Sequence, residues 1–278
     1  MRIGALMSLA ALLFVGGCNW LNDDVAGTNQ VTVLLTDAPA ADAAHLWVTF
    51  GRVDLVPAEG TGGGVITVYD GQPVIYDILA LTNGTTAELG AADAVPDGTY
   101  DQVRFIVQSA TLSYCDDVDL AICHDVDVFV PSGAQTGLKV NVQPPLILGG
   151  GANQTIVVDF DVERAIVETP PGSGNYLLKP TALRAISEAG AIAGSVLGLG
   201  GIGLVGVRVE VSATGSDELV VATTTEADGS FAFIALLAGT YDLTFVLDGY
   251  ESEVLDAVTV DVGETTDVGP VTMEELPD

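Results

Sequence analysis

The stretch Val31-Thr32-Val33-Leu34-Leu35-Thr36-Asp37-Ala38-Pro39 decides the fold class. Val31, Val33 and Leu35 alternate with Thr32, Leu34 and Thr36, which is the period-two pattern of a β-strand with one buried face. Thr36-Asp37-Ala38-Pro39 then ends the strand, because proline has no backbone N–H for the sheet ladder. The stretch predicts a short strand that enters a packed core.

The same alternation recurs along the first two thirds of the chain, with no long helical pattern between the strands. It occurs in residues 46–55, 65–69, 103–107, 126–130 and 158–163. A change of parity at Gly51 predicts a β-bulge, and residues 77–81 are expected to form one helical turn. In residues 158–163, Val158, Phe160 and Val162 are expected on one side of a strand, and the acids Asp159, Asp161 and Glu163 on the other. Regular short strands predict an antiparallel sandwich or barrel.

Residues 205–278 repeat the pattern and predict a second sandwich. Apolar residues alternate in residues 205–211, 241–247 and 258–262, and Asp228-Gly229 is typical of a tight turn. Residues 198–203 match G-x-G-x-x-G, but a strand follows where a dinucleotide site needs a helix, so we reject a nucleotide site. The predicted class is all-β, with two antiparallel β-sandwich domains in tandem. The boundaries are 31–187 and 205–278, with 188–204 as a glycine-rich linker and first strand region.

The N-terminus has the features of a secretory signal. Arg2 precedes an apolar run, residues 3–15, that is too short to span a membrane. Val15-Gly16-Gly17-Cys18 resembles a lipobox, so residues 1–17 are expected to be a lipoprotein signal peptide. Cys18 would carry the lipid, and residues 18–30 would form the tether. In lipoproteins of didermal bacteria, an Asp after the lipidated cysteine usually signals retention in the inner membrane. This chain has Asn19 there, so the resemblance implies an outer-membrane location. The alternative is an ordinary signal peptide with an incidental cysteine.

The charge excludes one class of partner. The 278 residues include 8 basic and 38 acidic side chains, a formal net charge of −30 at pH 7. Such a field repels nucleic acid, so no nucleic-acid partner is expected. Two explanations of the acidity stay open, which are solubility in a saline medium and calcium binding.

Cys115 and Cys123 form an even pair in an exported chain, so a disulfide between them is expected. The alternative is a Cys-Cys-His metal site that uses His124. Carboxylates around this loop are the candidate calcium ligands, since calcium takes six to eight oxygens. They are Asp116, Asp117, Asp119, Asp125 and Asp127. A solvated hairpin tip is the alternative.

Two family resemblances follow from ordered sets of segments. The first set is Leu35-Thr36-Asp37-Ala38-Pro39, Asp77-Ile78-Leu79-Ala80-Leu81, residues 96–104, residues 131–139, Val158-Asp159-Phe160-Asp161 and Tyr176-Leu177-Leu178-Lys179-Pro180. It resembles the lipoprotein domain of unknown function 4382, over residues 31–187, and implies no ligand. Residues 191–273, with Asp228-Gly229-Ser230-Phe231 and Gly239-Thr240-Tyr241, resemble the carboxypeptidase regulatory-like domain. That resemblance implies a transthyretin-like sandwich of the carbohydrate-binding-like class, used as a spacer, stabiliser or glycan-binding module.

No catalytic motif stands out. The two histidines lie in no nucleophile or zinc pattern, and acids are too abundant for any pair to mark a site. Asn83-Gly84-Thr85 matches a glycosylation sequon and indicates a surface loop. We therefore predict a non-catalytic, lipid-anchored envelope protein that acts as a binding or structural module. The membrane, and a glycan or envelope protein, are the expected partners, and calcium is the one cofactor considered. The alternative is carbohydrate binding through Tyr241 and Tyr250, with a calcium-dependent adhesin or an enzyme less favoured.

Overall fold

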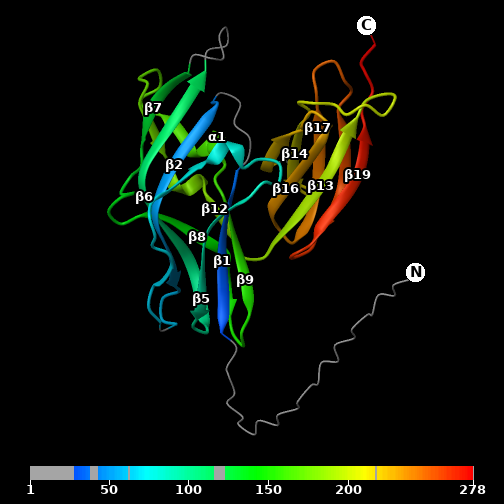
Figure 1. The fold of residues 1–278 in the computed structure, drawn as a ribbon. Helices are drawn as coiled ribbons and strands as arrows, with labels where there is room; N and C mark the ends of the chain where they lie inside the picture. The colour runs from blue at the N-terminus through cyan, green and yellow to red at the C-terminus, as the bar shows by residue number, and fades with distance from the viewer. Residues whose placement is uncertain (1–27, 38–42, 62, 116–122, 217, 278) are drawn as a thin grey trace, which may run out of the picture.

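The computed structural model describes residues 28–37, 43–61, 63–115, 123–216 and 218–277. The chain is 62% strand and 4% helical, which confirms the all-β class. Two domains follow one another along the chain, the first in blue to green and the second in yellow to red (Figure 1). Among the described residues, no helix is long and apolar enough to cross a membrane.

The N-terminal domain is one twelve-stranded sheet. Its strands are β1 (Asn29–Thr36), β2 (His45–Pro57), β3 (Ile66–Tyr69), β4 (Val74–Asp77), β5 (Ala87–Val95), β6 (Gly98–Cys115), β7 (Cys123–Phe129), β8 (Leu138–Leu148), β9 (Asn153–Asp159), β10 (Ile166–Glu168), β11 (Tyr176–Leu178) and β12 (Arg184–Ile186). The main path runs β10-β11-β7-β6-β8-β12-β9-β1-β5, and β2 joins β6 to β3 and β4. In the described part of this domain, three single-turn helices connect strands: η1 (Ile78–Ala80), α1 (Val162–Ala165) and η2 (Pro180–Ala182).

Opposite parts of this sheet pack on one hydrophobic core. The Phe50 ring of β2 makes edge contacts with Phe105 of β6 and with Phe160, which follows β9, at centroid distances of 5.9 and 6.1 Å. The alternating residues Val31, Val33 and Leu35 of β1 enter the same core and are fully buried. The period-two prediction is therefore confirmed.

Two local predictions are also confirmed, and one is wrong. The β2–β6 register shifts between Phe50 and Arg52, around the bulge expected at Gly51, and η1 supplies the expected helical turn. The strand expected over residues 158–163 instead ends at Asp159, and α1 begins at Val162. The sheet is not purely antiparallel. The neighbouring strands β1 and β9 run parallel over seven residue pairs.

The C-terminal domain is a sandwich of two sheets. Its strands are β13 (Ala189–Leu197), β14 (Arg208–Ala213), β15 (Leu219–Thr224), β16 (Ser230–Leu237), β17 (Gly239–Val246), β18 (Glu253–Val260) and β19 (Thr265–Thr272). One sheet has the order β16-β13-β19 and the other β15-β14-β17-β18. The Asp228–Gly229 turn carries the chain from β15 in one sheet to β16 in the other. After the glycine-rich loop of residues 198–203 comes β14, a strand, as expected.

Both domains use the same tyrosine device at the start of a strand. β6 begins Gly98-Thr99-Tyr100 and β17 begins Gly239-Thr240-Tyr241. The Tyr100 hydroxyl donates to the Pro96 carbonyl at 3.1 Å, and the Tyr241 hydroxyl donates to the Leu237 carbonyl at 2.8 Å. Each bond ties the buried ring to the backbone four residues upstream, so each tyrosine fixes the turn that leads into its strand.

Candidate functional site

The boundary between the two domains holds a set of polar contacts that one side chain brings together. Asn83, in the loop after η1, reaches from the N-terminal domain to the end of β15. Its side-chain amide donates to the Thr224 carbonyl at 3.0 Å and to the Glu226 carboxylate at 2.6 Å. Its side-chain oxygen accepts from the Thr223 hydroxyl at 2.8 Å. The Asn83 backbone has φ 51°, a left-handed conformation that asparagine tolerates better than most residues. The glycosylation sequon that begins at Asn83 therefore lies at the contact between the two domains.

Apolar packing lies beside these hydrogen bonds. Val157 of β9, Ile186 of β12 and Ala235 of β16 are buried together in one cluster. Gly84 lies close to β16, since a Cβ at Gly84 would come 3.0 Å from the Ala232 Cβ. Apolar contact and hydrogen bonds together hold the two domains against each other.

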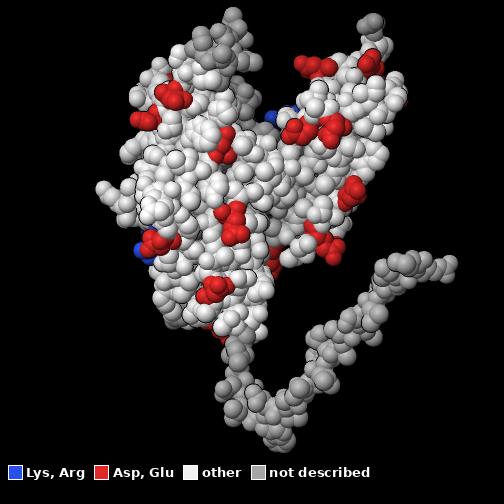
Figure 2. Space-filling model, in the orientation of Figure 1, with Lys and Arg blue, Asp and Glu red and all other residues white. Residues whose placement is uncertain are grey.

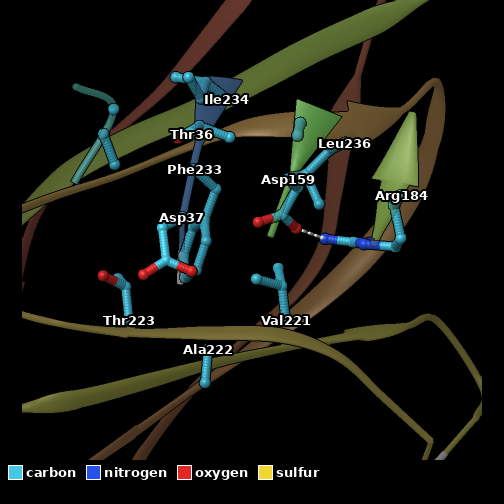
Figure 3. Close-up of a pocket in the computed structure, with 13 residues that line it drawn as sticks. Thr36, Asp37, Asp159, Arg184, Val221, Ala222, Thr223, Phe233, Ile234 and Leu236 are labelled. Carbon is cyan, nitrogen blue, oxygen red and sulfur yellow. Dashed lines mark hydrogen bonds and ion pairs between the residues drawn. The ribbon is translucent and has the colours of Figure 1, made fainter. Parts of the chain in front are cut away.

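A small cavity lies between the domains (Figure 3). Thr36, Asp37, Asp159 and Arg184 line it from the N-terminal domain, and residues of β15 and β16 line the other side. Its volume of about 20 Å³ is close to what one water molecule needs. The cavity is therefore too small for an organic substrate.

The acids of this cavity are used in structural contacts. Thr36 and Asp159 are direct neighbours at the carboxyl ends of the parallel strands β1 and β9. Asp159, whose side chain is only 3% exposed, forms an ion pair with Arg184. Asp37 is also buried, and its Oδ1 accepts from the Val162 N–H at 3.1 Å. This second bond places the first turn of α1 against the end of β1.

The burial of two acids, Asp159 and Asp161, corrects the expectation for residues 158–163. Asp159 and Asp161 are both buried, although the alternation placed them together on the side opposite the apolar residues. Burial raises the pKa of Asp161 above its ordinary value of 3.8, and Arg164, at 3.4 Å, opposes the shift. Asp159 is buried because β16 of the other domain covers the second face of β9, so both faces of this strand are enclosed. Asp161 lies beyond the end of β9, where α1 begins.

The predicted cysteine and calcium site is described only in part. Cys18, Asp116, Asp117 and Asp119 lie outside the described residues. Cys115 and Cys123 stand directly opposite each other across β6 and β7, and the disulfide between them stays a prediction. Asp125 and Asp127 are exposed on β7, and Asp125 accepts from the Ser113 hydroxyl. No group of three or more His, Cys, Asp or Glu in the described ranges is arranged to hold a metal ion.

The two tyrosines proposed for sugar binding both pack against the core of the C-terminal domain, and both hydroxyls are hydrogen-bonded within the chain. Tyr241 is 7% exposed and packs in the core of the C-terminal sandwich. Burial raises the pKa of its hydroxyl, which is bonded to Leu237. Tyr250 is partly buried against the same core, and its hydroxyl donates to Glu275 at 3.2 Å. Tyr241 therefore presents no open ring face on which a sugar could stack.

Comparison with known proteins agrees with this architecture of two tandem β domains. Residues 28–180 match the domain of unknown function DUF4382, and residues 191–274 match the carboxypeptidase regulatory-like domain. The chain is therefore an all-β protein that consists of two modules from different families. The first match covers more than half of the chain, so the chain belongs to the DUF4382 family.

Solved structures give only distant likenesses. The minor pilin GBS52 of Streptococcus agalactiae is 11% identical over 90% of this chain and 98% of its own, with a TM-score of 0.27. The shaft pilin SpaA of Lactobacillus rhamnosus GG is 12% identical over 90% and 99%, also with a TM-score of 0.27. A chain of the type II cohesin–X-dockerin complex of Acetivibrio cellulolyticus is 16% identical over 31% of this chain, with a TM-score of 0.26. Of that chain, 58% is covered. No curated protein matches. Scores this low say nothing of function.

Proposed function

We propose that this chain is a non-catalytic, lipid-anchored module of the cell envelope whose two sandwiches act as one mechanical unit. The observation that carries the proposal is the Asn83 contact, in which one side chain of the first domain makes three hydrogen bonds to the second. A linker between independent domains would need no such contact, because relative motion is the default for domains with a small interface. The apolar cluster of Val157, Ile186 and Ala235 supports the same conclusion.

The small cavity between the domains favours a structural role for the buried acids that line it. An active site needs a concave pocket with convergent polar groups, usually of several hundred Å³. The cavity that gathers the buried acids has room for about one water molecule. Asp37 and Asp159 are already bonded to Val162 and Arg184. These carboxylates therefore stabilise the fold where the domains meet.

The two ends of the chain suit an anchored module. β1 begins at the lower end of the N-terminal domain, whereas the C-terminus lies at the upper end of the C-terminal domain (Figure 1). A lipid on Cys18 would be joined to Asn29 by a segment that spans at most roughly 40 Å when fully extended. The N-terminal sandwich would then lie near the membrane, and the C-terminal sandwich would be directed away from it.

Membrane fractionation tests the anchor. The native chain and Cys18→Ser are expressed in a didermal host, and each is followed through membrane and soluble fractions. The native chain is expected in the outer-membrane fraction, and Cys18→Ser is expected in the soluble fraction or as unprocessed precursor. Cys123→Ser serves as the matched control, because it removes a cysteine that is not the proposed lipid site. Equal membrane partitioning of the native chain and Cys18→Ser would contradict the anchor.

A further inference from the structure

Three basic side chains gather on the outer face of the N-terminal sheet. Across β2, β6 and β8, Asp54 stands opposite Arg104, and Arg104 stands opposite Lys139. Residues directly opposite in antiparallel strands project from the same face. The next positions along these strands, Val53, Phe105 and Leu138, are buried in the core, so Arg104 and Lys139 face outward.

Only one of these cations is neutralised. Arg52 Nε donates to Asp54 Oδ1 at 2.7 Å, and Thr67 donates to the same oxygen at 3.2 Å. This bond, with the charge of Asp54, raises the pKa of Arg52, and Asp70 adds to the shift. Within the part of the chain that the structure describes, no carboxylate lies within 4.0 Å of the charged nitrogens of Arg104 or Lys139. The face keeps two uncompensated positive charges side by side.

Such a pair is unexpected in this chain. Acidic side chains outnumber basic ones by 38 to 8, and Figure 2 shows acids spread over the visible face of both domains with few basic groups between them. Like charges directly opposite each other in a sheet are destabilising. Among the described residues, Arg52, Arg164, Arg184 and Arg208 each have a carboxylate partner. Folding alone therefore does not explain why Arg104 and Lys139 stand together without one.

The two cations lie in an open groove. Its volume is about 410 Å³, and its lining is Arg52, Asp54, Arg104, Ile106, Gln135, Thr136 and Lys139. Gly137, with φ 78°, brings the turn before β8 against the Arg104 side chain, since a Cβ there would lie 2.7 Å from Arg104 Cγ. The Nε atom of Arg104 is buried and has no hydrogen-bond partner. The turn before β8 thus packs closely on the aliphatic part of Arg104. Beside the basic side chains, the groove is lined by the amide residue Gln135 and the hydroxyl residue Thr136.

We propose that this groove binds an acidic saccharide, through a carboxylate held by Arg104 and Lys139. A guanidinium and an ammonium both donate charge-assisted hydrogen bonds to a carboxylate. Gln135 and Thr136 offer partners for sugar hydroxyls, whereas Ile106 is the only apolar residue in the lining. That polarity favours a saccharide over a protein partner, because the cores of protein interfaces are apolar and aromatic. The negative field of the whole chain does not prevent binding, since exposed charges are largely screened beyond about 8 Å at physiological salt.

The test is titration calorimetry of the purified full chain in detergent at 0.15 M NaCl. The probes are a tetramer of galacturonic acid, its neutral galactose counterpart and a tetraglutamate peptide. The variants are Arg104→Gln and Lys139→Gln. Lys179→Gln is the matched control, because Lys179 is also exposed but does not line the groove. We expect the acidic tetramer to bind, Arg104→Gln and Lys139→Gln each to weaken it at least fivefold, and Lys179→Gln to change it less than twofold. The thermal midpoint of each variant is measured beside its affinity, so that binding is compared at a temperature at which every variant is folded.

Three results would overturn the proposal. One is the absence of binding by the uronate tetramer. Another is binding that Lys139→Gln leaves unchanged, which is decisive because Lys139 is exposed and its loss does not threaten the fold. The third is tighter binding of tetraglutamate than of the uronate, which would point to an acidic protein partner. The Cys18 anchor and the domain contact are independent of all three results.

Discussion

The side-chain oxygen of Asn83 accepts a hydrogen bond from the Thr223 hydroxyl across the domain boundary, at 2.8 Å. With the two bonds that the Asn83 amide donates, this side chain serves a donor and two acceptors of the second domain. An isolated surface loop would have left these groups to water. The contact is therefore the basis for treating the two sandwiches as one unit.

Removal of this side chain should weaken the domain contact. Asn83→Gly deletes three hydrogen bonds but keeps a residue suited to positive φ, so we expect a loss of roughly 1–2 kcal/mol in chemical denaturation. Asn83→Ala deletes the same bonds and adds left-handed strain, of about 1 kcal/mol more. If glycine and alanine were both neutral, the hydrogen bonds would not contribute to stability.

The paired tyrosine device gives a second prediction. Tyr100→Phe and Tyr241→Phe each remove one hydroxyl and leave one backbone carbonyl without its partner. Each should lower the free energy of unfolding by about 1 kcal/mol, because the ring packing is kept. A substantially larger loss in Tyr241→Phe, together with lost glycan binding, would instead support the sugar-binding role first assigned to Tyr241.

Two carboxylates should respond to pH in opposite directions. The pKa of Asp161 is raised by burial, so the folded state holds its proton more tightly, and this group's stabilising contribution is lost as the pH rises from 3.8 through the raised pKa. The pKa of Asp242 is lowered by hydrogen bonds from Ala257 and Thr214, so its contribution is lost as the pH falls below 3.8. At pH 7 we expect Asp161→Asn to melt above the native chain and Asp242→Asn below it. Both differences should shrink below pH 4. Thermal midpoints from pH 3 to 8 measure this, and equal signs at pH 7 would be inconsistent with it.

The strand pattern could be predicted from the sequence wherever one face of a strand meets the core and the other meets solvent. Val31, Val33 and Leu35 follow that rule. Asp159 and Asp161 do not, because β16 covers the second face of β9 and the strand ends before Asp161. Alternation within a strand carries no information about a second domain that closes over it.

The candidate sites were harder to predict for a related reason. Asn83 matched a sequon, yet its partners lie about 140 residues further along the chain. Arg104 and Lys139 are neighbours only through the β6–β8 register. No local sequence motif predicts the Asn83 contact or the pairing of Arg104 with Lys139, and a net charge of −30 predicts no basic patch. The sequence alone does not reveal that Tyr241 is closed to sugar stacking, because the bond from its hydroxyl to the Leu237 carbonyl has no sequence signature beyond a glycine two positions before it.

Salt should stabilise the chain by screening its acidic groups. Because the Debye length falls from about 30 Å at 0.01 M to about 8 Å at 0.15 M, the thermal midpoint should rise with NaCl. We expect CaCl₂ at matched ionic strength to give the same curve. A saturable excess with calcium, abolished when Asp117 and Asp119 are changed to Asn, would establish the metal site and contradict this expectation.

The distance between the two domains in solution tests the central claim most directly. Nitroxide labels at Ile147 on β8 and Val254 on β18 sit on exposed positions of the two domains, 76% and 51% exposed. Double electron–electron resonance should give one narrow distance distribution in the otherwise native chain. The distribution should broaden in a chain that also carries Asn83→Gly and Ile186→Ala, which remove polar and apolar parts of the contact. A broad distribution in the native chain, unchanged by these substitutions, would show that the sandwiches move independently and that they do not form one unit.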